Sequence, residues 1–402
     1  MKMEKVNIVH DLEVAYGTVY GFEEAAALME VLQNKAPSCG KKVKEFEDAF
    51  SSYCGTKYGI AVTSATTGLT LAGIALGIKP GDEVITTPIS WISTASAFSV
   101  LGAKIVFCDV EPQTLNMDPD KLERLITTKT KAIVPVHLYG RCCNMDKLIE
   151  LSQKYSIPII EDCAHNPGGE YKGRKSGSMG DIGVFSFHQQ KNMSTLGEGG
   201  LVTTNRKEFF EKIINYRSLC CRIYGPNSKY LSIDEEKYPM EKEYWKLTFD
   251  DFGYNFRMTD AQAAVGIVQL KKLDNNNKRR KELADYLISK LKNVKDIILP
   301  EDEKDGINTW HLFMIQLAPN INISKRDFMW EIYTKKGIKA WSHYIPIHMS
   351  TPYVNDGHKI GECPVAEEAF NRYITFPLHP TLTFEALDYL ANSIIEILKS
   401  QD

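Results

Sequence analysis

Short apolar runs alternate with stretches of helical periodicity over residues 58–205. The apolar runs lack a strict alternation of polar and apolar positions, which is typical of strands covered on both faces. The helical stretches between them are suited to serve as crossovers between parallel strands. The pattern predicts a mostly parallel sheet of seven strands, at residues 58–64, 82–88, 104–110, 131–138, 157–164, 182–188 and 200–205.

Helical spacing marks both ends of the chain as well. Apolar residues recur at this spacing over residues 21–33 and 43–55, and Gly55 stands where a left-handed C-cap is expected. A longer helical pattern covers residues 259–293, and the asparagines at 275–277 predict an interruption in it. Further strands and helices are predicted at residues 310–317, 325–337, 374–378 and 384–400.

The length of the chain, 402 residues, exceeds the usual size of one domain. We predict a larger α/β domain over residues 1–260 and a smaller α+β domain over residues 261–402, with the junction near residues 260–280. Residues 220–251 are polar, aromatic and irregular, and this stretch is too long for an ordinary connector. We expect a functional loop or an interface loop there.

Composition excludes several classes of protein. The 48 Lys and Arg residues nearly balance the 51 Asp and Glu residues, so no strong field attracts nucleic acid or an anionic membrane. No apolar stretch approaches the roughly 18 residues of a membrane span, and the first residues lack the apolar core of a signal peptide. Nine scattered cysteines without a CxxC pair predict free thiols, with neither disulfides nor a metal site. We therefore expect a cytoplasmic protein.

Two charged residues follow predicted strands, where ligands bind in sheets of this kind. Lys191 comes after strand 182–188 and before a glycine-rich turn, so it is either a solvated end charge or the covalent anchor of a cofactor. Asp162, with Glu161, closes the run IPIIED at residues 157–162, where a buried carboxylate is costly unless a cation pairs with it. A positively charged ring nitrogen would supply that cation, and the alternative is a helix cap or a surface turn.

Three further positions are candidates for the same site. Residues 64–67 join a strand to a helix, and the free N–H groups there suit a phosphate monoester, although ordinary N-capping explains the same residues. Trp91 follows a strand and either stacks on a planar ring or fills a core. His165 comes three residues after Asp162, so both side chains can face one pocket.

Several motifs occur in a characteristic order, namely SATTGL, TPISWISTASA, VHLYG, EDCAH, GDIGVFSFHQQKNMSTLGEGG, GYNFRMTDAQAAVGIVQL and SHYIPIH. In this order and spacing they resemble the DegT and StrS family of sugar aminotransferases. The resemblance extends from about residue 20 to residue 395. It implies fold type I of the pyridoxal 5′-phosphate-dependent transferases, the fold of aspartate aminotransferase, and it implies pyridoxal 5′-phosphate as the cofactor.

The resemblance also assigns roles around the cofactor ring. By position, Lys191 matches the family lysine that bonds covalently to the cofactor aldehyde, and Asp162 matches the acid that pairs with the pyridine nitrogen. This pairing keeps the ring protonated, so that the ring can accept electrons from a carbanion. His165 matches a residue that touches the phenolic oxygen of the ring, and Trp91 matches the aromatic residue stacked on the ring.

The cofactor phosphate has its own matching residues. Ser186 and the amides of Ala65 and Thr66 resemble the family's phosphate cradle, whereas Asn255 resembles an asparagine that reaches the phosphate of the neighbouring subunit. The resemblance therefore implies a homodimer with shared active sites. Ala65 stands where many relatives have glycine, which adds a methyl group near the phosphate.

The substrates implied by the resemblance are an amino acid donor, glutamate or glutamine, and a keto-sugar acceptor in amino-sugar biosynthesis. A nucleotide-linked keto-sugar is expected, and a keto-sugar phosphate and a keto-cyclitol are the alternative acceptors. His343, Tyr344 and His348 in the motif SHYIPIH are candidate substrate contacts, or else they form a turn of stacked aromatic residues and prolines.

Three other functions compete with transamination. A sugar dehydratase of the same family has histidine in place of the anchoring lysine, so Lys191 argues against it. A non-catalytic regulator that keeps the fold would lack the lysine or the acid, and neither Lys191 nor Asp162 is missing. A nucleotide-dependent oxidoreductase would need a GxGxxG turn after the first strand, which SATTGL does not supply.

Overall fold

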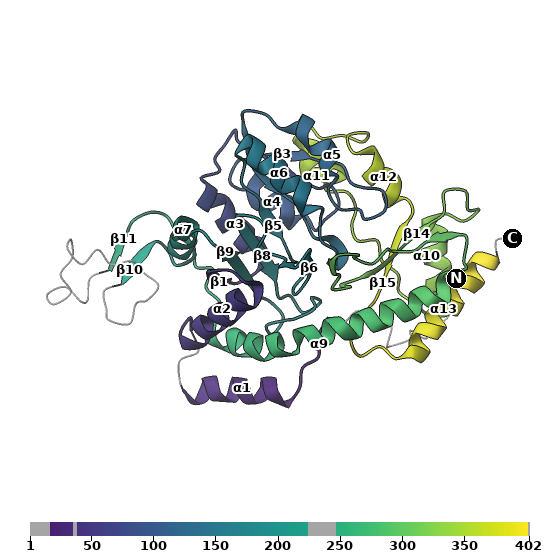
Figure 1. Ribbon diagram of the computed structural model, residues 1–402, viewed down its shortest axis with the longest axis horizontal. Coiled ribbons are helices and arrows are strands. Elements are labelled where there is room, and N and C mark those ends of the chain that lie inside the picture. The colour runs from purple at the N-terminus through teal and green to yellow at the C-terminus, as the bar shows by residue number, and fades with distance from the viewer. Residues whose placement is uncertain (1–16, 35–37, 224–246, 401–402) are drawn as a thin grey trace, which may run out of the picture.

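The computed structural model describes residues 17–34, 38–223 and 247–400 (Figure 1). Its centre is a sheet in which strands run in the order β1-β9-β8-β5 and β4-β2-β3. Two parallel bridges, Ile133 to Ile159 and Val136 to Asp162, join β4 to β5 and make the sheet continuous. The strands are β1 (Tyr58–Val62), β2 (Glu83–Thr86), β3 (Lys104–Phe107), β4 (Thr130–Val134), β5 (Ile160–Asp162), β8 (Ile182–Ser186) and β9 (Gly200–Thr204).

The direction of the strands agrees with the prediction of a mostly parallel sheet. β9 runs antiparallel to both of its neighbours, β1 and β8, whereas β5, β4, β2 and β3 continue parallel to β8. The seven-stranded, mostly parallel α/β sheet predicted from the sequence is therefore confirmed.

Both faces of the sheet are covered, which explains why its strands are continuously apolar. Val184 and Val202 pack into one core with helices α3 (Ala65–Leu76), α4 (Ser93–Ser99) and α7 (Lys207–Arg217). Phe185 and Leu201, which are adjacent to these residues on the same strands, pack into a second core with α2 (Lys41–Cys54). Successive residues of a strand point to opposite faces, so each buried strand needs apolar side chains at every position.

A smaller antiparallel sheet lies in the C-terminal part of the chain (Figure 1). It is formed by β12 (Ile297–Ile298), β14 (Phe313–Leu317) and β15 (Tyr373–Phe376). Helices α10 (Lys325–Lys336) and α13 (Phe384–Lys399) pack with it around a separate apolar core. The other described α-helices and strands are α1 (Phe22–Gln33), α5 (Pro119–Leu122), α6 (Met145–Tyr155), α11 (Thr351–Asn355), α12 (Pro364–Phe370), β6 (Glu170–Tyr171), β7 (Arg174–Lys175), β10 (Cys221–Ile223), β11 (Leu247–Phe249) and β13 (Gly306–Ile307), and there are short 3-10 helices at η2 (Glu123–Leu125), η3 (Leu138–Gly140) and η4 (Ile347–Met349).

Helix α9 (Asp260–Leu291) connects the two parts of the molecule. It is continuous, so the interruption expected at residues 275–277 is wrong. The reason is tertiary: Asn277 is buried, its side-chain amide donates to Pro167 O (2.9 Å), and its Oδ1 accepts from the Asn192 amide (3.0 Å). These partners satisfy a polar side chain that would otherwise compete with the helix backbone.

The domain boundary after residue 260 stays a prediction. Helix α9 begins there, and its N-terminal half packs on α1 and α2 while its C-terminal half contacts α13.

Two smaller points agree with the sequence analysis: Gly55 ends α2 with a φ of 73°, and all nine cysteines are free thiols.

The irregular stretch at residues 220–251 lies largely outside the described residues. Its described ends form the antiparallel pair β10 and β11, which extends from the body of the molecule beside α7 in Figure 1. Within the described ranges, none of the helices combines the length and the apolar character that crossing a membrane requires.

Candidate active site

Lys191 lies in the segment between β8 and β9, close to the end of β8. Its side chain is half-buried, and among the described residues neither a hydrogen bond nor an ion pair reaches its Nζ. Desolvation lowers the pKa of the Lys191 ammonium to about 8, although the negative charge of Asp162 acts in the opposite direction. This environment differs from that of a solvated end charge, because it favours a neutral, nucleophilic amine.

Asp162 ends β5, and only 3% of it is exposed. Its Oδ2 accepts from Thr94 Oγ1 in helix α4 (2.7 Å), and its Oδ1 accepts from the N–H of Ala164 (3.1 Å). Burial raises the pKa of Asp162, and the hydrogen bonds from Thr94 and Ala164 and the charge of Lys191 act against that rise. No cation of the described chain lies within ion-pair distance of this carboxylate.

The chemistry of Asp162 fits a protonated pyridine nitrogen. Each carboxylate oxygen can accept two hydrogen bonds, and each accepts one from the described residues. A buried carboxylate with spare acceptor capacity and no cationic partner is costly unless a bound group supplies the positive charge.

His165 is 2% exposed and, like Asp162, lies close enough to Lys191 to feel its charge; we call the surroundings of these three side chains the pocket. Its Nδ1 accepts from the backbone N–H of Tyr139 (3.4 Å), and its Nε2 lies 3.2 Å from Tyr344 Oη. Desolvation and the charge of Lys191 keep the pKa of His165 well below its ordinary value. The imidazole is therefore neutral at physiological pH.

Trp91 is 60% exposed, so the alternative that it fills a core is excluded. Its ring meets the Tyr344 ring edge-on, with centroids 5.9 Å apart and an interplanar angle of 64°. An indole held in this way keeps a face available for a planar ring.

The residues expected to hold the phosphate lie at the start of α3. Ser64 caps this helix by accepting from Thr67 N (3.3 Å), so the N–H groups of Ala65 and Thr66 fall in the first turn, where helices leave donors unpaired. Ser186 ends β8 and pairs with Gly200 of β9. A Cβ atom at Gly200 would lie 2.7 Å from Ala65 N, so the strand ends come very close to this helix terminus.

This arrangement fits a phosphate, since it brings helix N–H donors and a serine hydroxyl to one place. Ordinary capping by Ser64 and the exposed donors of the first turn coexist here, so the two interpretations of residues 64–67 do not exclude each other.

Asn255 is exposed and bridges to Ser218. The next residue, Phe256, accepts a hydrogen bond at its carbonyl from Thr63 N (3.0 Å). The segment therefore runs beside the carboxyl end of β1, at the same edge of the sheet as α3. The position of Asn255 at the surface leaves its side chain accessible to another subunit.

The motif SHYIPIH divides into two environments. His343 and Tyr344 border the pocket, and burial and the charge of Lys191 lower the pKa of His343 to about 4. His348 is fully buried elsewhere, where its Nε2 pairs with Glu367 (2.9 Å) and its ring contacts Phe107. The structure therefore does not place His348 with the other candidate substrate contacts.

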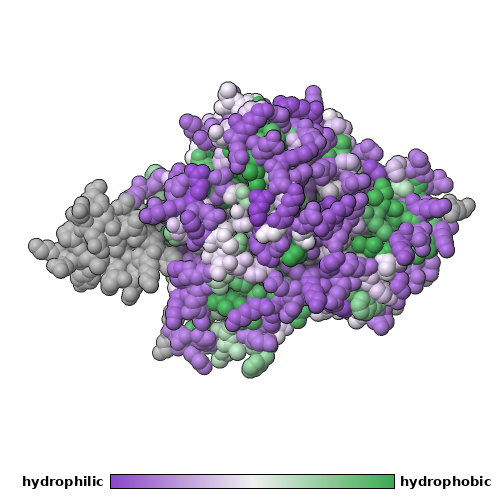
Figure 2. Space-filling model, in the orientation of Figure 1, coloured by the Kyte–Doolittle hydropathy of each residue, from purple (hydrophilic) through white to green (hydrophobic). Residues whose placement is uncertain are grey.

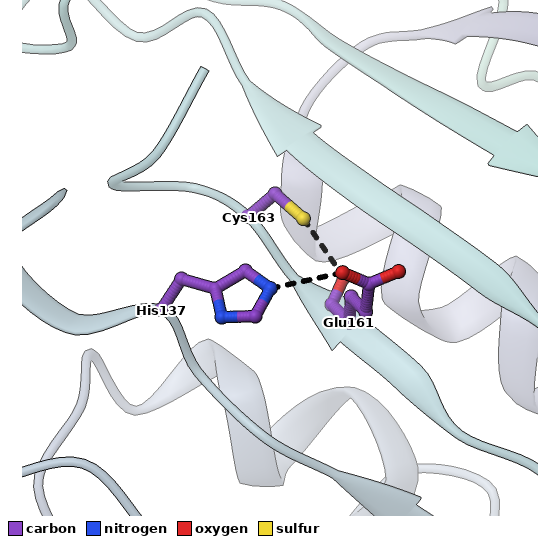
Figure 3. A group of neighbouring side chains, drawn as sticks. All are labelled: His137, Glu161 and Cys163. Carbon is purple, nitrogen blue, oxygen red and sulfur yellow. Dashed lines mark hydrogen bonds and ion pairs between the residues drawn. The ribbon is translucent and has the colours of Figure 1, made fainter. Parts of the chain in front are cut away.

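Glu161, the neighbour of Asp162 on β5, points to a different environment (Figure 3). Its carboxylate pairs with His137 Nε2 (2.9 Å) and accepts from the N–H groups of Gly177, Met179 and Gly180 at 3.0, 2.8 and 2.6 Å. Cys163 lies near enough to complete a set of metal-ligand types. However, burial raises the pKa of the Cys163 thiol well above its ordinary value, and the carboxylate is already saturated. This cluster is structural.

Sequence reasoning missed two residues of the site, Thr94 and Tyr139. Thr94 lies on α4, three residues after Trp91, and that short separation was the available signal. Tyr139 lies in the motif VHLYG, but nothing in the sequence indicated that its backbone N–H and its hydroxyl act on His165 and on the His343 carbonyl, which are distant in sequence.

Comparisons with known proteins identify the family of this chain. A profile of the DegT/DnrJ/EryC1/StrS aminotransferase family matches residues 20–395. The spore coat polysaccharide biosynthesis protein SpsC of Bacillus subtilis is 36% identical over 384 residues, which cover 95% of this chain and 96% of that protein. GDP-perosamine synthase of Caulobacter vibrioides is 34% identical over 362 residues, which cover 90% of this chain and 91% of that protein.

A solved structure gives the same result for the fold. Helicobacter pylori PseC, an aminotransferase involved in the biosynthesis of pseudoaminic acid, has a TM-score of 0.87 and 28% identity over 96% of this chain and 98% of its own. The fold type, the enzyme class and the cofactor implied by the resemblance are thereby confirmed. The chain belongs to the DegT/DnrJ/EryC1/StrS aminotransferase family and is a pyridoxal 5′-phosphate-dependent sugar aminotransferase.

Proposed function

We propose that this enzyme moves an amino group from glutamate or glutamine to a nucleotide-linked keto-sugar in the cytoplasm, and that Lys191 and Asp162 carry the chemistry. The observation that supports this most directly is that a desolvated lysine, with a pKa of about 8, lies close enough to a buried carboxylate to feel its charge, while that carboxylate has no ion-pair partner among the described residues. Each residue is costly to bury on its own, and a cofactor with an aldehyde and a protonated ring nitrogen satisfies both.

The cofactor, when bound, supplies an electrophilic carbon and a ring that accepts an electron pair. Asp162 would keep the ring nitrogen protonated, and Thr94 would hold this carboxylate in place through its 2.7 Å hydrogen bond. Lys191 Nζ would anchor the group and then, as a free amine, take the proton from the α-carbon of the donor amino acid. The lowered pKa of Lys191 suits this base, because the amine must be neutral to accept a proton.

The remaining predicted residues would orient the cofactor. Trp91 would cover one face of the ring, and His165 would lie on the side of the phenolic oxygen. Ser186 and the N–H groups of Ala65 and Thr66 would hold the phosphate. The methyl group of Ala65 projects from the first turn of α3 without replacing an N–H donor, so it is compatible with this role.

The acceptor is proposed from the relatives and from the environment of His343. GDP-perosamine synthase is named for a nucleotide-linked amino sugar, which supports a nucleotide-linked acceptor here. His343 is neutral and half-buried beside the pocket, so it can exchange hydrogen bonds with the hydroxyl groups of a sugar without introducing a charge.

We also propose a homodimer in which Asn255 completes the phosphate site of the neighbouring subunit. The exposed position of Asn255 and the apolar side chains exposed on α1 support an interface in this region. Those side chains are Phe22, Met29 and Leu32.

The test is a half-reaction followed by absorbance. The purified protein with pyridoxal 5′-phosphate should show a visible absorption band, which glutamate or glutamine should convert and a nucleotide-linked keto-sugar should restore. Lys191→Ala is the control: turnover should stop, while phosphate-dependent binding of the cofactor should persist in part. A wild-type band that neither amino acid changes would contradict the proposed function.

A further inference from the structure

The hydrogen bonds of His165 determine which of its nitrogens carries the proton. The backbone N–H of Tyr139 can only donate, so Nδ1, at 3.4 Å, must be an unprotonated acceptor. A neutral imidazole with a free Nδ1 carries its proton on Nε2. Nε2–H therefore donates to Tyr344 Oη, which lies 3.2 Å away.

Tyr344 is left with a hydroxyl proton that it can donate. Because Tyr344 Oη accepts from His165, its own O–H is available, and among the described residues no acceptor takes it. Burial and the charge of Asp162 raise the pKa of Tyr344, so the phenol keeps its proton throughout the physiological range. His165 therefore donates to Tyr344, and Tyr344 can in turn donate to a further oxygen, so both hydrogen bonds run in the same direction.

The backbone of Tyr344 is held in place from two sides. The hydroxyl of Tyr139 donates to the carbonyl of His343, and the hydroxyl of Tyr373 donates to the carbonyl of Tyr344. Tyr139 follows the sheet strand β4 and Tyr373 begins β15, so this segment is anchored to both parts of the molecule. The free donor is therefore positioned before any ligand binds.

Tyr344 also lies among the residues assigned to the cofactor ring. Its ring contacts that of Trp91, its hydroxyl contacts His165, and it lies close enough to Asp162 to feel the charge of that residue. In the described structure Tyr344 Oη takes up the Nε2–H of His165, the group that was expected to touch the phenolic oxygen of the ring.

We propose that Tyr344, rather than His165, donates the hydrogen bond to the phenolic oxygen of bound pyridoxal 5′-phosphate, and that His165 acts behind it as a positioning residue. The inference rests on the proposed function, since it assumes that the cofactor binds covalently at Lys191. The ligand atom is an electron-rich oxygen, which a neutral donor can bind without protonating it.

The experiment measures cofactor binding in the absence of both substrates. Tyr344→Phe removes the hydroxyl and keeps the ring, so the dissociation constant of pyridoxal 5′-phosphate should rise by about ten- to hundredfold, as expected for a lost hydrogen bond to a charged oxygen. The pH midpoint of the absorption band should shift as well. A cofactor analogue methylated on the phenolic oxygen should bind the wild type and Tyr344→Phe with nearly equal affinity.

Two variants serve as controls. Tyr353→Phe removes a buried tyrosine hydroxyl that bonds Ser99 (3.1 Å) away from the pocket, and its cofactor affinity and spectrum should match the wild type. His165→Ala should weaken cofactor binding less than Tyr344→Phe, because the donor itself remains.

Other outcomes would overturn the inference. If Tyr344→Phe binds the cofactor with the wild-type affinity and spectrum while the KM for the keto-sugar rises, the hydroxyl contacts the sugar instead. If His165→Ala causes the larger loss, His165 is the direct contact. The proposed function itself is tested separately, by whether the wild type forms an absorption band that depends on Lys191.

Discussion

Burial disfavours the charged forms of both Lys191 and Asp162, the two residues at the centre of the candidate active site. The same desolvation that lowers the pKa of Lys191 to about 8 raises the pKa of Asp162. The mutual attraction of the two charges offsets part of this effect, and the hydrogen bonds from Thr94 and Ala164 favour the ionised carboxylate. Lys191 therefore loses its proton readily, and Asp162 stays ionised when a cationic group binds beside it.

The lowered pKa of Lys191 predicts the pH dependence of cofactor attachment. Only the neutral amine bonds to an aldehyde, so the rate at which the apoprotein gains its absorption band should rise with pH, with a midpoint at about 8. Stopped-flow absorbance across this range measures the midpoint.

Asp162→Asn is the matched variant for this prediction. Because the charge of Asp162 raises the pKa of Lys191, the midpoint should move to lower pH when that charge is removed. A midpoint near the ordinary lysine pKa in the wild type, or an upward shift in Asp162→Asn, would contradict the assigned environment of Lys191.

At the scale of single elements, β5 carries two neighbouring carboxylates whose side chains point to opposite faces of the sheet, because side-chain direction alternates along a strand. Asp162 turns to the pocket, whereas Glu161 turns to the loop at residues 177–180 and secures it through three backbone N–H groups and His137. This loop precedes β8, which leads to Ser186 and then to Lys191. One short strand therefore carries the acid that we propose as the cofactor's counter-charge and stabilises the loop that leads to the lysine.

Glu161→Gln should destabilise the fold while leaving the pocket chemistry in place. The glutamine amide would present N–H groups to backbone N–H donors, and a loss of about 1–3 kcal/mol in the free energy of unfolding is expected for buried polar groups left unsatisfied. Urea unfolding followed by fluorescence measures the change.

Glu150→Gln on helix α6 is the control, because Glu150 is exposed and its substitution should have little effect. If the two variants unfold at the same urea concentration, Glu161 does not stabilise the loop as described.

At the scale of the whole molecule, two exposed features are suited to contact a second subunit. Most of the face shown in Figure 2 is polar, and one of its apolar areas lies over α1 and α2. Phe22 on α1 is 84% exposed, and the exposed Asn255 lies beside the carboxyl end of β1. A dimer formed through this region would bury apolar surface and carry Asn255 toward a neighbouring site.

Subunit complementation tests this arrangement. A Lys191→Ala subunit and an Asn255→Ala subunit each lack one part of the proposed site, but a mixed dimer contains one complete site. Co-expression should therefore restore about a quarter of the wild-type activity, since half of the dimers are mixed and each has one working site of two.

The control combines Asn255→Ala with a chain that carries both substitutions, which cannot assemble a complete site. Activity in the mixed dimers that does not exceed this control would show that Asn255 does not act across subunits.

The sequence alone was sufficient for the fold, and it indicated the two residues that we propose as the centre of the chemistry. The seven strands follow from local hydrophobic patterning, because a strand buried on both faces must be apolar at every position. Lys191 and Asp162 stand at strand ends, where the topology of a parallel sheet gathers ligand-binding groups regardless of the details of packing. The order of the motifs then indicated the family, which the comparisons confirmed.

Only the tertiary structure decided how those groups are supported. Thr94 bonds Asp162 across 68 positions of sequence, and Tyr344 meets His165 across 179. Other tertiary contacts keep α9 unbroken at Asn277 and hold His348 away from the pocket. Local patterns report which faces are buried, whereas the partner of a buried polar group depends on which distant segments the fold brings together.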